Sequence, residues 1–285
     1  MKTSHHIYFK DASCMEDVPD ESVNLVITSP PYPMIEMWDD MFTKADPAIG
    51  SLFRSLESSQ SEDDVSKIYS RMHLYLGKVW SECFRVLANG GIACINIGDA
   101  TRNINGNYRL FPNHSRILHA FDNLGFITLP YVLWSKPTNK PNAFLGSGFL
   151  PPNAYVTVDA EYILIFRKGG LRHFTPHHRI RYASKFTKAE RDTWFSQIWT
   201  LKGAKQQNPA ILRRTGAYPQ EISDRLVKMF SIAGDTILDP FLGTGTTIKS
   251  AIAHGRSSIG YEIDKSLKPV IKQKLGISAE VGLSD

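Results

Sequence analysis

The most informative group of residues is Ser29-Pro30-Pro31-Tyr32, which directly follows the apolar run 23–28. The run predicts a short buried strand, and two consecutive prolines end it in a rigid bend that lacks two backbone donors. The proline carbonyls can therefore accept hydrogen bonds from a ligand, beside a serine hydroxyl and a tyrosine ring. Such a set suits a planar molecule that carries an amino group. We predict a catalytic centre here, and a proline turn followed by a core tyrosine is the structural alternative.

A glycine-rich motif lies near the other end of the chain, between a predicted strand at 236–238 and a predicted helix at 248–254. Its glycines let the backbone approach a ligand closely, because no Cβ stands in the way. Its last two threonines fall at the start of the helix, where free N–H groups and the helix dipole favour an anion. The motif reads Asp239-Pro240-Phe241-Leu242-Gly243-Thr244-Gly245-Thr246-Thr247.

The next predicted strand, residues 258–264, ends in an acid. An acid after the second strand of a βαβ unit can accept hydrogen bonds from ribose hydroxyls, and we assign Glu262 to this role. Strand, loop, helix, strand and acid together predict a site for a cofactor that carries a nucleoside. A phosphate-binding loop with a lysine is excluded, because no Gly-Lys-Ser/Thr sequence occurs.

Together the two motifs resemble those of the amino-group DNA methyltransferases of restriction-modification systems, which use S-adenosyl-L-methionine. The order is the permuted, β-type one, in which the catalytic motif precedes the cofactor motif. The resemblance implies an α/β fold of the Rossmann-like type, with a doubly wound, mostly parallel sheet of seven strands, one of them antiparallel. It also implies a small basic insert that recognises the target DNA.

The resemblance extends to two further segments. Residues 7–12 are similar to the family's strand whose terminal Asp meets the adenine amino group. Residues 215–221 are similar to the stretch that lines the methionine end of the cofactor, although Thr215, Gly216 and Tyr218 replace His, Pro and Phe. The residues assigned to the cofactor are therefore Asp11, Ala12, Tyr218, Pro219, Asp239, Pro240, Phe241, Gly243, Thr244, Gly245, Thr246, Thr247 and Glu262.

The predicted reaction is direct methyl transfer to the exocyclic amine of a base swung out of the duplex, because that atom is out of reach inside the helix. The Ser29 hydroxyl and the Pro30 carbonyl would accept the N–H groups of the amine, and Tyr32 would stack on the base. Within the family, Ser at the first motif position accompanies N4-cytosine enzymes and Asp accompanies N6-adenine enzymes. The sequence therefore favours cytosine N4, with adenine N6 as the alternative.

The positive charge of the chain is concentrated in one segment. Residues 162–220 carry twelve basic and two acidic side chains, a net charge of +10, so the rest of the chain carries −5 of the overall +5. A strongly basic segment on a mildly acidic body predicts a polyanionic partner, here double-stranded DNA; a solvated charged face is the alternative. The assigned DNA contacts are Arg172, Arg179, Arg181, Lys185, Lys188, Lys202 and Lys205.

These motifs divide the chain into three segments. Residues 1–166 are predicted to be the catalytic half of the core, 167–214 the basic target-recognition segment, and 215–285 the cofactor half. The first segment contains a mobile insert at about 40–66, whose polar part, 55–66, has the composition of a loop or lid. Helices are expected at 68–88, ended by Asn89-Gly90-Gly91, and at 115–123, with strands at 92–99, 129–134 and 161–166.

Composition excludes several classes. No uninterrupted apolar stretch approaches the length of a membrane helix, and no signal-peptide segment is visible. Cys14, Cys83 and Cys94 have the apolar surroundings of reduced core thiols, which favours a cytoplasmic protein. No metal site is expected, because no metal-binding Cys or His spacing occurs. The family resemblance leaves open a monomer or homodimer, and a cognate endonuclease encoded separately.

Proteins of other classes explain less of the sequence. A nicotinamide-dependent dehydrogenase accounts for the glycine loop and the acid after it, but not for Ser-Pro-Pro-Tyr or the basic segment. A non-catalytic nucleic-acid-binding module accounts for the basic segment alone. An RNA or protein methyltransferase shares the predicted core and differs in its substrate.

Overall fold

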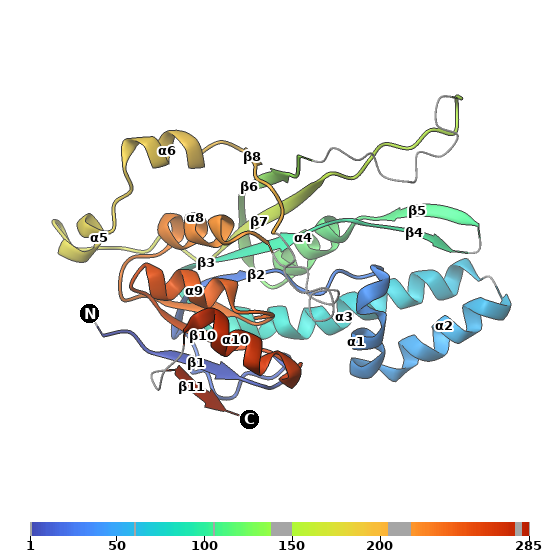
Figure 1. The fold of residues 1–285 in the computed structure, drawn as a ribbon, viewed down its shortest axis with the longest axis horizontal. Coiled ribbons are helices and arrows are strands. Elements are labelled where there is room, and N and C mark those ends of the chain that lie inside the picture. Colours follow the sequence, from blue (N-terminus) through green and yellow to red (C-terminus); the bar gives the residue numbers. More distant parts are fainter. Residues whose placement is uncertain are drawn as a thin grey trace.

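The computed structural model describes residues 2–59, 61–104, 106–137, 150–204, 218–276 and 281–284. Within them the chain forms a nine-stranded sheet, in the order β11-β1-β10-β9-β2-β3-β7-β6-β8, and a separate hairpin of β4 and β5 (Figure 1). The strands are β1 (His5–Tyr8), β2 (Val23–Thr28), β3 (Leu87–Ile97), β4 (Ala100–Ile104), β5 (Asn107–Phe111), β6 (Phe126–Ser135), β7 (Ala160–Lys168), β8 (Ile198–Thr200), β9 (Thr236–Asp239), β10 (Ser257–Tyr261) and β11 (Val281–Ser284).

The strands of the large sheet run in one direction except β7, which is antiparallel to β3 on one side and to β6 on the other. The predicted α/β architecture, mostly parallel with one antiparallel strand, is confirmed. The sheet has nine strands instead of seven, because β8 and β11 add one strand to each edge. An edge strand as short as β8, three residues in a polar segment, leaves no pattern that the sequence could reveal.

The order of the strands reverses between β2 and β9. From β2 the chain proceeds to β3 on one side, whereas from β9 it proceeds to β10 on the other. In open parallel sheets, ligands bind outside the carboxyl ends of the strands at such a reversal. Both chemical motifs begin where these two strands end, so the fold brings Ser29 and Asp239 to the same edge. β1 lies beside β10 and thus in the cofactor half, although it belongs to the first sequence segment.

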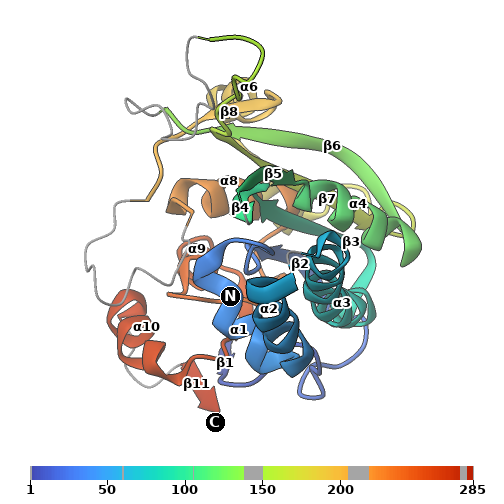
Figure 2. The ribbon, with the colours of Figure 1, turned by 90° about the vertical axis from the view of Figure 1, so that its right-hand side faces the viewer.

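Helices cover both faces of the sheet. Figure 2 shows α3 and α4 on one side and α8 and α9 on the other. The strands between them are apolar toward both layers: Leu25 and Ile27 of β2 pack with α8, whereas Val26 packs with α3. The helices are α1 (Asp39–Ala45), α2 (Pro47–Ser59), α3 (Glu62–Val86), α4 (Asn113–Asn123), α5 (Arg179–Ala183), α6 (Lys188–Trp194), α8 (Gln220–Phe230), α9 (Thr246–Ala253) and α10 (Lys268–Leu275).

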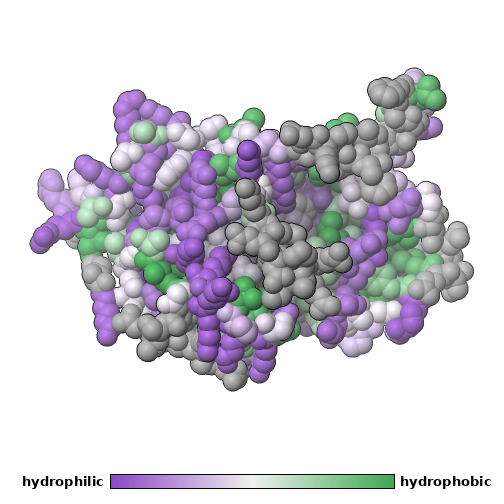
Figure 3. All heavy atoms as spheres, viewed as in Figure 1, coloured by the Kyte–Doolittle hydropathy of each residue, from purple (hydrophilic) through white to green (hydrophobic). Residues whose placement is uncertain are grey.

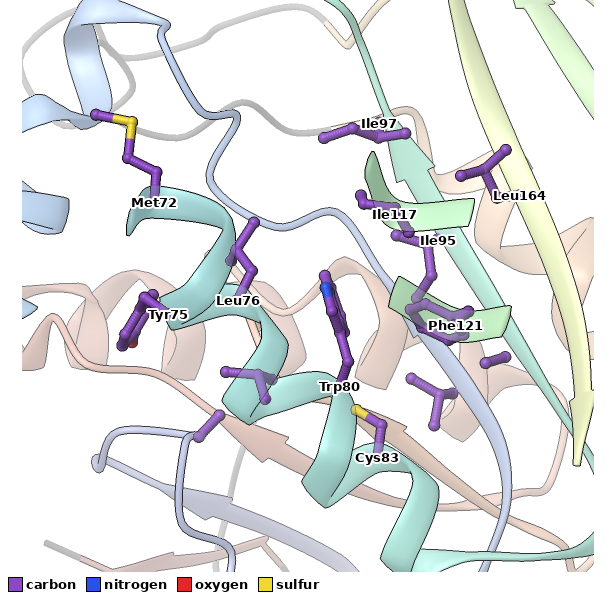
Figure 4. Packing of buried hydrophobic residues seen from close by; sticks show 14 of the residues in the cluster. Met72, Tyr75, Leu76, Trp80, Cys83, Ile95, Ile97, Ile117, Phe121 and Leu164 are labelled. Carbon is purple, nitrogen blue, oxygen red and sulfur yellow. The ribbon is translucent and has the colours of Figure 1, made fainter. Parts of the chain in front are cut away.

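The largest apolar cluster lies between α3, α4 and the sheet. Figure 4 shows one face of α3 directed at β3 and α4, with Trp80 at the centre. Trp80 is 1% exposed and its ring lies 5.4 Å from that of Phe121. The stripe predicted from the spacing of apolar residues is confirmed for its members at 68, 72, 75, 76, 79 and 83, which are buried. Phe84 is partly buried against the same cluster, and Leu87 is buried but is the first residue of β3.

The prediction of a loop or lid at 55–66 is wrong. The segment contains the end of α2 and the start of α3. Ser61 caps α3 by accepting from the Asp64 N–H, and the acids that made the segment look polar occupy the first turn of that helix, where they complement its dipole. Residues 47–59 are an amphipathic helix whose apolar side chains, Leu52, Phe53 and Leu56, pack on the main core.

The boundary after α3 also differs from the prediction. The helix ends at Val86 and β3 begins at Leu87, so residues 89–91 belong to the strand and not to a helix cap. The glycines accommodate an irregular start of the strand, because the register between β2 and β3 shifts after the Val23–Leu87 pair. Gly90 has φ +80°, and a Cβ there would lie 2.8 Å from the backbone nitrogen of Arg172.

Three smaller observations concern the excluded classes. None of the helices in the described part of the chain combines the length and hydropathy that a bilayer-spanning helix needs. Among the described residues, no group of three or more His, Cys, Asp and Glu side chains is placed to hold a metal. Cys83 and Cys94 are buried as expected, but Cys14 is exposed, because it lies in the turn after β1.

Candidate active site

A pocket of about 720 Å³ opens at the carboxyl ends of β2 and β9. It is bounded by the chain after β1, the proline bend, α1, the glycine motif and the chain after β10. Its volume lies within the range of roughly 300–1,000 Å³ that is typical of pockets for small molecules. The residues that line it are Lys10, Asp11, Ala12, Ser29, Pro31, Met37, Trp38, Asp40, Met41, Lys44, Tyr75, Tyr218, Asp239, Pro240, Phe241, Leu242, Gly243, Thr244, Thr246, Tyr261, Glu262, Ile263, Asp264, Ser266 and Leu267.

The proline bend contributes Ser29 and Pro31 to the wall of the pocket. Pro30 is buried, and neither it nor Tyr32 is among the lining residues. The Tyr32 and Ser29 hydroxyl oxygens lie 3.1 Å apart. The structure therefore brings Ser29 to the pocket, with the Tyr32 hydroxyl in contact with it.

Tyr32 belongs to a polar network that links residues from several strand ends. Its hydroxyl donates to Glu161 Oε2 at 2.8 Å and accepts from Asn96 Nδ2 at 2.8 Å. Asn96 Nδ2 also donates to Glu161 Oε2 at 2.6 Å, and Lys136 forms an ion pair with Glu161 Oε1. Burial and the neighbouring Glu161 charge raise the pKa of Tyr32 well above its ordinary value, so the phenol stays neutral.

Asp239 joins the two motifs. Its Oδ1 accepts from the Thr28 hydroxyl at 2.7 Å and from the Phe241 N–H at 3.1 Å, and its Oδ2 accepts from the Thr247 hydroxyl at 2.5 Å. Burial outweighs these hydrogen bonds and raises the pKa of Asp239 to about 6. The Tyr218 hydroxyl lies 2.6 Å from that of Thr247, which ties the predicted methionine-end segment to the same cluster.

The glycine loop has the conformation that its glycines allow. Gly243 and Gly245 have φ of +54° and +87°, a left-handed region in which a Cβ is strained, and Gly245 caps the start of α9. The two oxygens of Glu262 accept from the Gly243 N–H and the Asp264 N–H, each at 2.8 Å. Burial raises the pKa of Glu262 to about 7. The acid is thus fixed beside the loop and still lines the pocket.

The start of the chain completes this side of the pocket. Asp11 and Ala12 follow β1 and line the cavity, as predicted. Asp11 Oδ1 accepts from the Ser13 N–H at 2.8 Å and from the Tyr75 hydroxyl at 3.0 Å. Pro219 lies at the cap of α8 next to Tyr218 but is not itself among the lining residues, and Gly245 and Thr247 stand just behind the wall.

The basic segment is divided between opposite edges of the sheet. Arg172 forms a bidentate ion pair with Asp235, directly before β9, at 2.6 and 2.8 Å. The Ala233 N–H donates to Ser184 just after α5, and Figure 1 shows α5 at the end of the molecule opposite to α1. Arg172, Arg179, Arg181 and Lys185 therefore lie at the amino ends of the parallel strands, away from the pocket.

The rest of the segment returns toward the pocket edge. Lys188 pairs with Asp192 on the exposed side of α6, and Figure 3 shows hydrophilic side chains over α5 and α6. β8 pairs with the end of β6, and Lys202 follows it as an exposed side chain at the carboxyl edge. Lys205 lies outside the described residues. Of the described DNA-contact candidates, Lys202 is thus the one placed on the pocket side.

The sequence also matches known proteins over most of its length. The model of the DNA methylase family, which comprises N6 and N4 enzymes, matches residues 23–273 and so includes both motifs. The chain belongs to the DNA methylase family. The resemblance read from the motifs is confirmed, and S-adenosyl-L-methionine, the predicted cofactor, is the one that this family uses.

Two type II methyltransferases are similar to the chain over most of its length. The chain is 62% identical over 279 residues to the type II methyltransferase M.MjaI of Methanocaldococcus jannaschii, with 96% of this chain and 92% of the relative covered. It is 48% identical over 280 residues to the type II methyltransferase M.MthZI of Methanothermobacter thermautotrophicus, with 96% and 77% covered.

Solved structures share the fold. TTHA0409 of Thermus thermophilus, crystallised with S-adenosyl-L-methionine, superposes with a TM-score of 0.75 at 29% identity, covering 99% of this chain and 100% of that one. The cytosine-N4-specific PvuII DNA methyltransferase superposes with a TM-score of 0.63 at 15% identity, covering 99% and 96%, which shows a common fold.

Sequence reasoning missed two parts of the methylase site. One is α1 with the residues before it, which form a whole wall through Met37, Trp38, Met41 and Lys44. Their spacing of three to four is helical and could have been recognised. The other is Lys274 of α10, which donates to the Thr244 and Thr246 hydroxyls at 2.8 and 2.6 Å. Burial lowers its pKa to about 8, and no motif pointed to it.

Proposed function

We propose that this methylase transfers a methyl group from S-adenosyl-L-methionine to N4 of cytosine in double-stranded DNA. The observation that carries the proposal is the juxtaposition of Ser29 with Asp239 and Glu262 in one pocket at the strand-order reversal. A methyl acceptor bound at the proline bend and a cofactor bound at the glycine loop would meet there.

The residues on the cofactor side fit the parts of S-adenosyl-L-methionine. Glu262 is fixed by two backbone N–H groups and offers further lone pairs to the ribose hydroxyls. Asp11 stands after β1, where its Oδ2 can accept from the adenine amino group. Tyr218, Asp239 and Thr244 line the opposite end, which suits the methionine part. The bound cofactor supplies an electrophilic methyl group on a sulfonium, so positioning provides most of the catalysis.

Ser29 and Pro30 act on the amine that receives the methyl group. The lone pair of an exocyclic amine is delocalised into the base, which makes the nitrogen a poor nucleophile. Hydrogen bonds from its N–H groups to Ser29 Oγ and to the Pro30 carbonyl draw the nitrogen toward a tetrahedral geometry and turn the lone pair toward the methyl carbon. We propose that the Tyr32 ring stacks on the base, while its hydroxyl holds Ser29 through their 3.1 Å contact.

The choice of cytosine N4 rests on Ser29. An Asp at this position would accept two N–H groups as an anion, whereas a serine hydroxyl is a neutral acceptor, and within the resembled family serine accompanies N4-cytosine enzymes. Both bases present an amine of the same geometry, so the choice between cytosine and adenine depends on how the rest of the base is held.

Duplex DNA is proposed to approach the carboxyl edge of the sheet. Lys202 and the following residues of the 167–214 segment would contact phosphates there. We leave Arg172 out of the contact set because Asp235 occupies its guanidinium. The names of the type II relatives M.MjaI and M.MthZI support a role beside a separately encoded endonuclease, and we propose a monomeric or homodimeric cytoplasmic enzyme.

Mass spectrometry of the nucleosides from treated DNA tests the proposal. The chain is incubated with unmethylated genomic DNA and S-adenosyl-L-methionine, and the DNA is digested to nucleosides. We expect N4-methylcytosine, formed about 10²–10³-fold more slowly by the Ser29→Ala variant. N6-methyladenine as the sole product would overturn the cytosine assignment, and no methylated nucleoside would overturn the proposed function.

A further inference from the structure

The polar network behind Ser29 has one self-consistent set of hydrogen positions. The Tyr32 phenol has a single hydrogen, and its neighbour Glu161 Oε2, part of a carboxylate paired with Lys136, has none to give. The phenol hydrogen therefore lies on the line to Glu161. The oxygen of Tyr32 is left as an acceptor, toward Asn96 Nδ2 at 2.8 Å and toward Ser29 Oγ at 3.1 Å.

The orientation of the Asn96 amide supports this set. Turning the amide over would place its oxygen against Glu161 Oε2 at 2.6 Å, which would oppose two acceptors with no hydrogen between them. The two amide hydrogens thus go to their closest partners, Glu161 and Tyr32, and not to Ser29 at 3.4 Å. The Ser29 hydrogen then points at Tyr32, so its lone pairs are left for the pocket.

We propose that Ser29, Tyr32 and Glu161 form a proton relay that takes up the proton released by the methylated amine, an inference that rests on the proposed function. Once the amine nitrogen has gained a methyl group it carries one proton too many and a positive charge. The N–H bond breaks and its electrons remain on nitrogen. The proton binds Ser29 Oγ, the Ser29 hydrogen passes to Tyr32, and the Tyr32 hydrogen passes to Glu161 Oε2.

Charge and atoms balance in this sequence. The amine becomes neutral, Ser29 and Tyr32 each end with one hydrogen as before, and the Glu161 carboxylate becomes a neutral acid. A serine hydroxyl alone is too weak a base to keep the proton, and the relay passes it on to the carboxylate of Glu161. Ser29 is the catalytic residue, because it touches the amine, and Glu161 acts through Tyr32 as a positioning residue and proton acceptor.

The surroundings of Glu161 suit this role. Its side chain is 13% exposed, whereas that of its ion-pair partner Lys136 is 37% exposed and contacts the other oxygen, Oε1. Oε2 is therefore left for the relay, and the exposed Lys136 side offers a way for the proton to reach solvent. Gly98 keeps the network compact: a Cβ there would lie 2.9 Å from the Tyr32 ring and 3.2 Å from Glu161 Cγ. The groups that face Glu161 are Tyr32, Asn96 and Lys136.

The variant Glu161→Gln tests the relay, because glutamine keeps the size and the acceptor oxygen but cannot take up the proton. We expect the single-turnover rate of methyl transfer to fall about 100-fold, while the dissociation constants for DNA and cofactor change less than about threefold. Glu161→Asp should recover part of the rate. Tyr32→Phe should be as slow as Glu161→Gln, and the double variant no slower than either, since the residues act as a unit.

A second readout needs neither cofactor nor DNA. The pKa of Tyr32 is raised by burial and by the Glu161 charge, so Glu161→Gln should lower it. Titration of ¹³C-tyrosine by NMR, with the Tyr32 signal assigned by its loss in Tyr32→Phe, measures this shift. Glu62→Gln is the matched control, because Glu62 is an exposed acid paired with Arg109 away from the pocket, and it should leave the rate and the Tyr32 signal unchanged.

The outcomes separate the relay from the function beneath it. An active wild type together with a folded Glu161→Gln variant of equal rate overturns the relay alone. The same holds if the variant is slow only because its melting temperature or its affinity for DNA has fallen, and if Glu161→Asp recovers nothing. A wild type that methylates no DNA overturns the proposed function and, with it, the relay.

Discussion

The two walls of the pocket are held in different ways. The cofactor wall, which we define as Asp239, residues 243–247 and Glu262, is fixed mostly by backbone N–H groups and by hydroxyls of its own motif. The target wall, which we define as Ser29 with Tyr32, is fixed by side chains from β3, β7 and the end of β6. The cofactor wall is thus held largely by its own motif, with Thr28 and Lys274 as partners from other elements, whereas the target wall depends on the assembled sheet.

This difference predicts separable defects. Damage to the cofactor wall should weaken cofactor binding, because its groups meet parts of the cofactor that do not react. Damage to the target wall should slow the transfer and leave cofactor binding intact, because its groups act on the amine in the transition state. The variants below test this separation.

The largest effect is expected for Ser29→Ala. The variant loses the acceptor that orients the amine, and we expect kcat to fall about 10²–10³-fold, a magnitude typical of one lost transition-state hydrogen bond. The dissociation constant for S-adenosyl-L-methionine, measured by calorimetry, should stay within about twofold of the wild type. A comparable loss of cofactor affinity would show that the two walls are not separable.

Glu262→Gln should give the opposite pattern. Loss of a charged acceptor for the ribose is expected to weaken cofactor binding about 10–100-fold, which corresponds to roughly 1.5–3 kcal/mol. At saturating cofactor the transfer rate should change little. Calorimetry and single-turnover kinetics at high cofactor concentration provide the two measurements, and a rate that stays low at saturation would contradict the assignment.

The raised pKa of Glu262, about 7, makes cofactor binding depend on pH. Above pH 7 the ionised carboxylate can accept from both ribose hydroxyls; as the pH falls through 7 it becomes protonated, and affinity should fall. The same shift means that the folded state binds this proton more tightly than the unfolded chain. The free energy of unfolding should therefore decrease as the pH rises from about 4.5 to 7, and level off above pH 7. In Glu262→Gln the change of cofactor affinity near pH 7 should disappear. A change near pH 6, where Asp239 titrates, should remain.

The smallest effects concern the two edges of the sheet. Lys202→Ala should weaken DNA binding a few-fold and reduce the slope of log affinity against log salt by about 1, because one phosphate contact is lost.

Arg172→Ala should leave DNA binding unchanged and lower stability by about 1–3 kcal/mol, since the buried Asp235 loses its partner. Fluorescence anisotropy over a salt series measures the DNA affinity of both variants, and thermal denaturation measures their stability. Weaker DNA binding in Arg172→Ala together with unchanged binding in Lys202→Ala would place DNA at the amino edge.

The same contrast explains how much the sequence could reveal. Several partners on the cofactor wall are close in sequence: Thr247 lies 8 residues from Asp239, and Gly243 lies 19 from Glu262, although Thr28, which also donates to Asp239, lies 211 residues away. A contiguous motif therefore predicted this wall, and the rule for parallel strands predicted that Ser29 would join it. The partners of Tyr32 lie 64 and 129 residues away. Only the pairing of β3 with β7 brings Asn96 and Glu161 together, and no local pattern encodes that.

Two further features were not read from the sequence, for physical reasons. The wall formed by α1 was missed because its polar and charged residues, read without helical spacing, resemble a loop. The basic segment was identified by its charge, but a count of charges does not say toward which edge of a sheet each side chain points. Arg172 follows β7, which is antiparallel and so ends at the amino edge of the parallel strands, and Asp235 precedes β9 at the same edge. Their contact therefore depends on the order and direction of the strands in the sheet.

A crystal structure of the chain with S-adenosyl-L-homocysteine would test the account most directly. We predict that the ribose hydroxyls lie within hydrogen-bonding distance of Glu262 and that the sulfur faces Ser29 across the pocket. A ligand bound elsewhere, or one whose sulfur points away from Ser29, would contradict the shared pocket on which the proposed reaction depends.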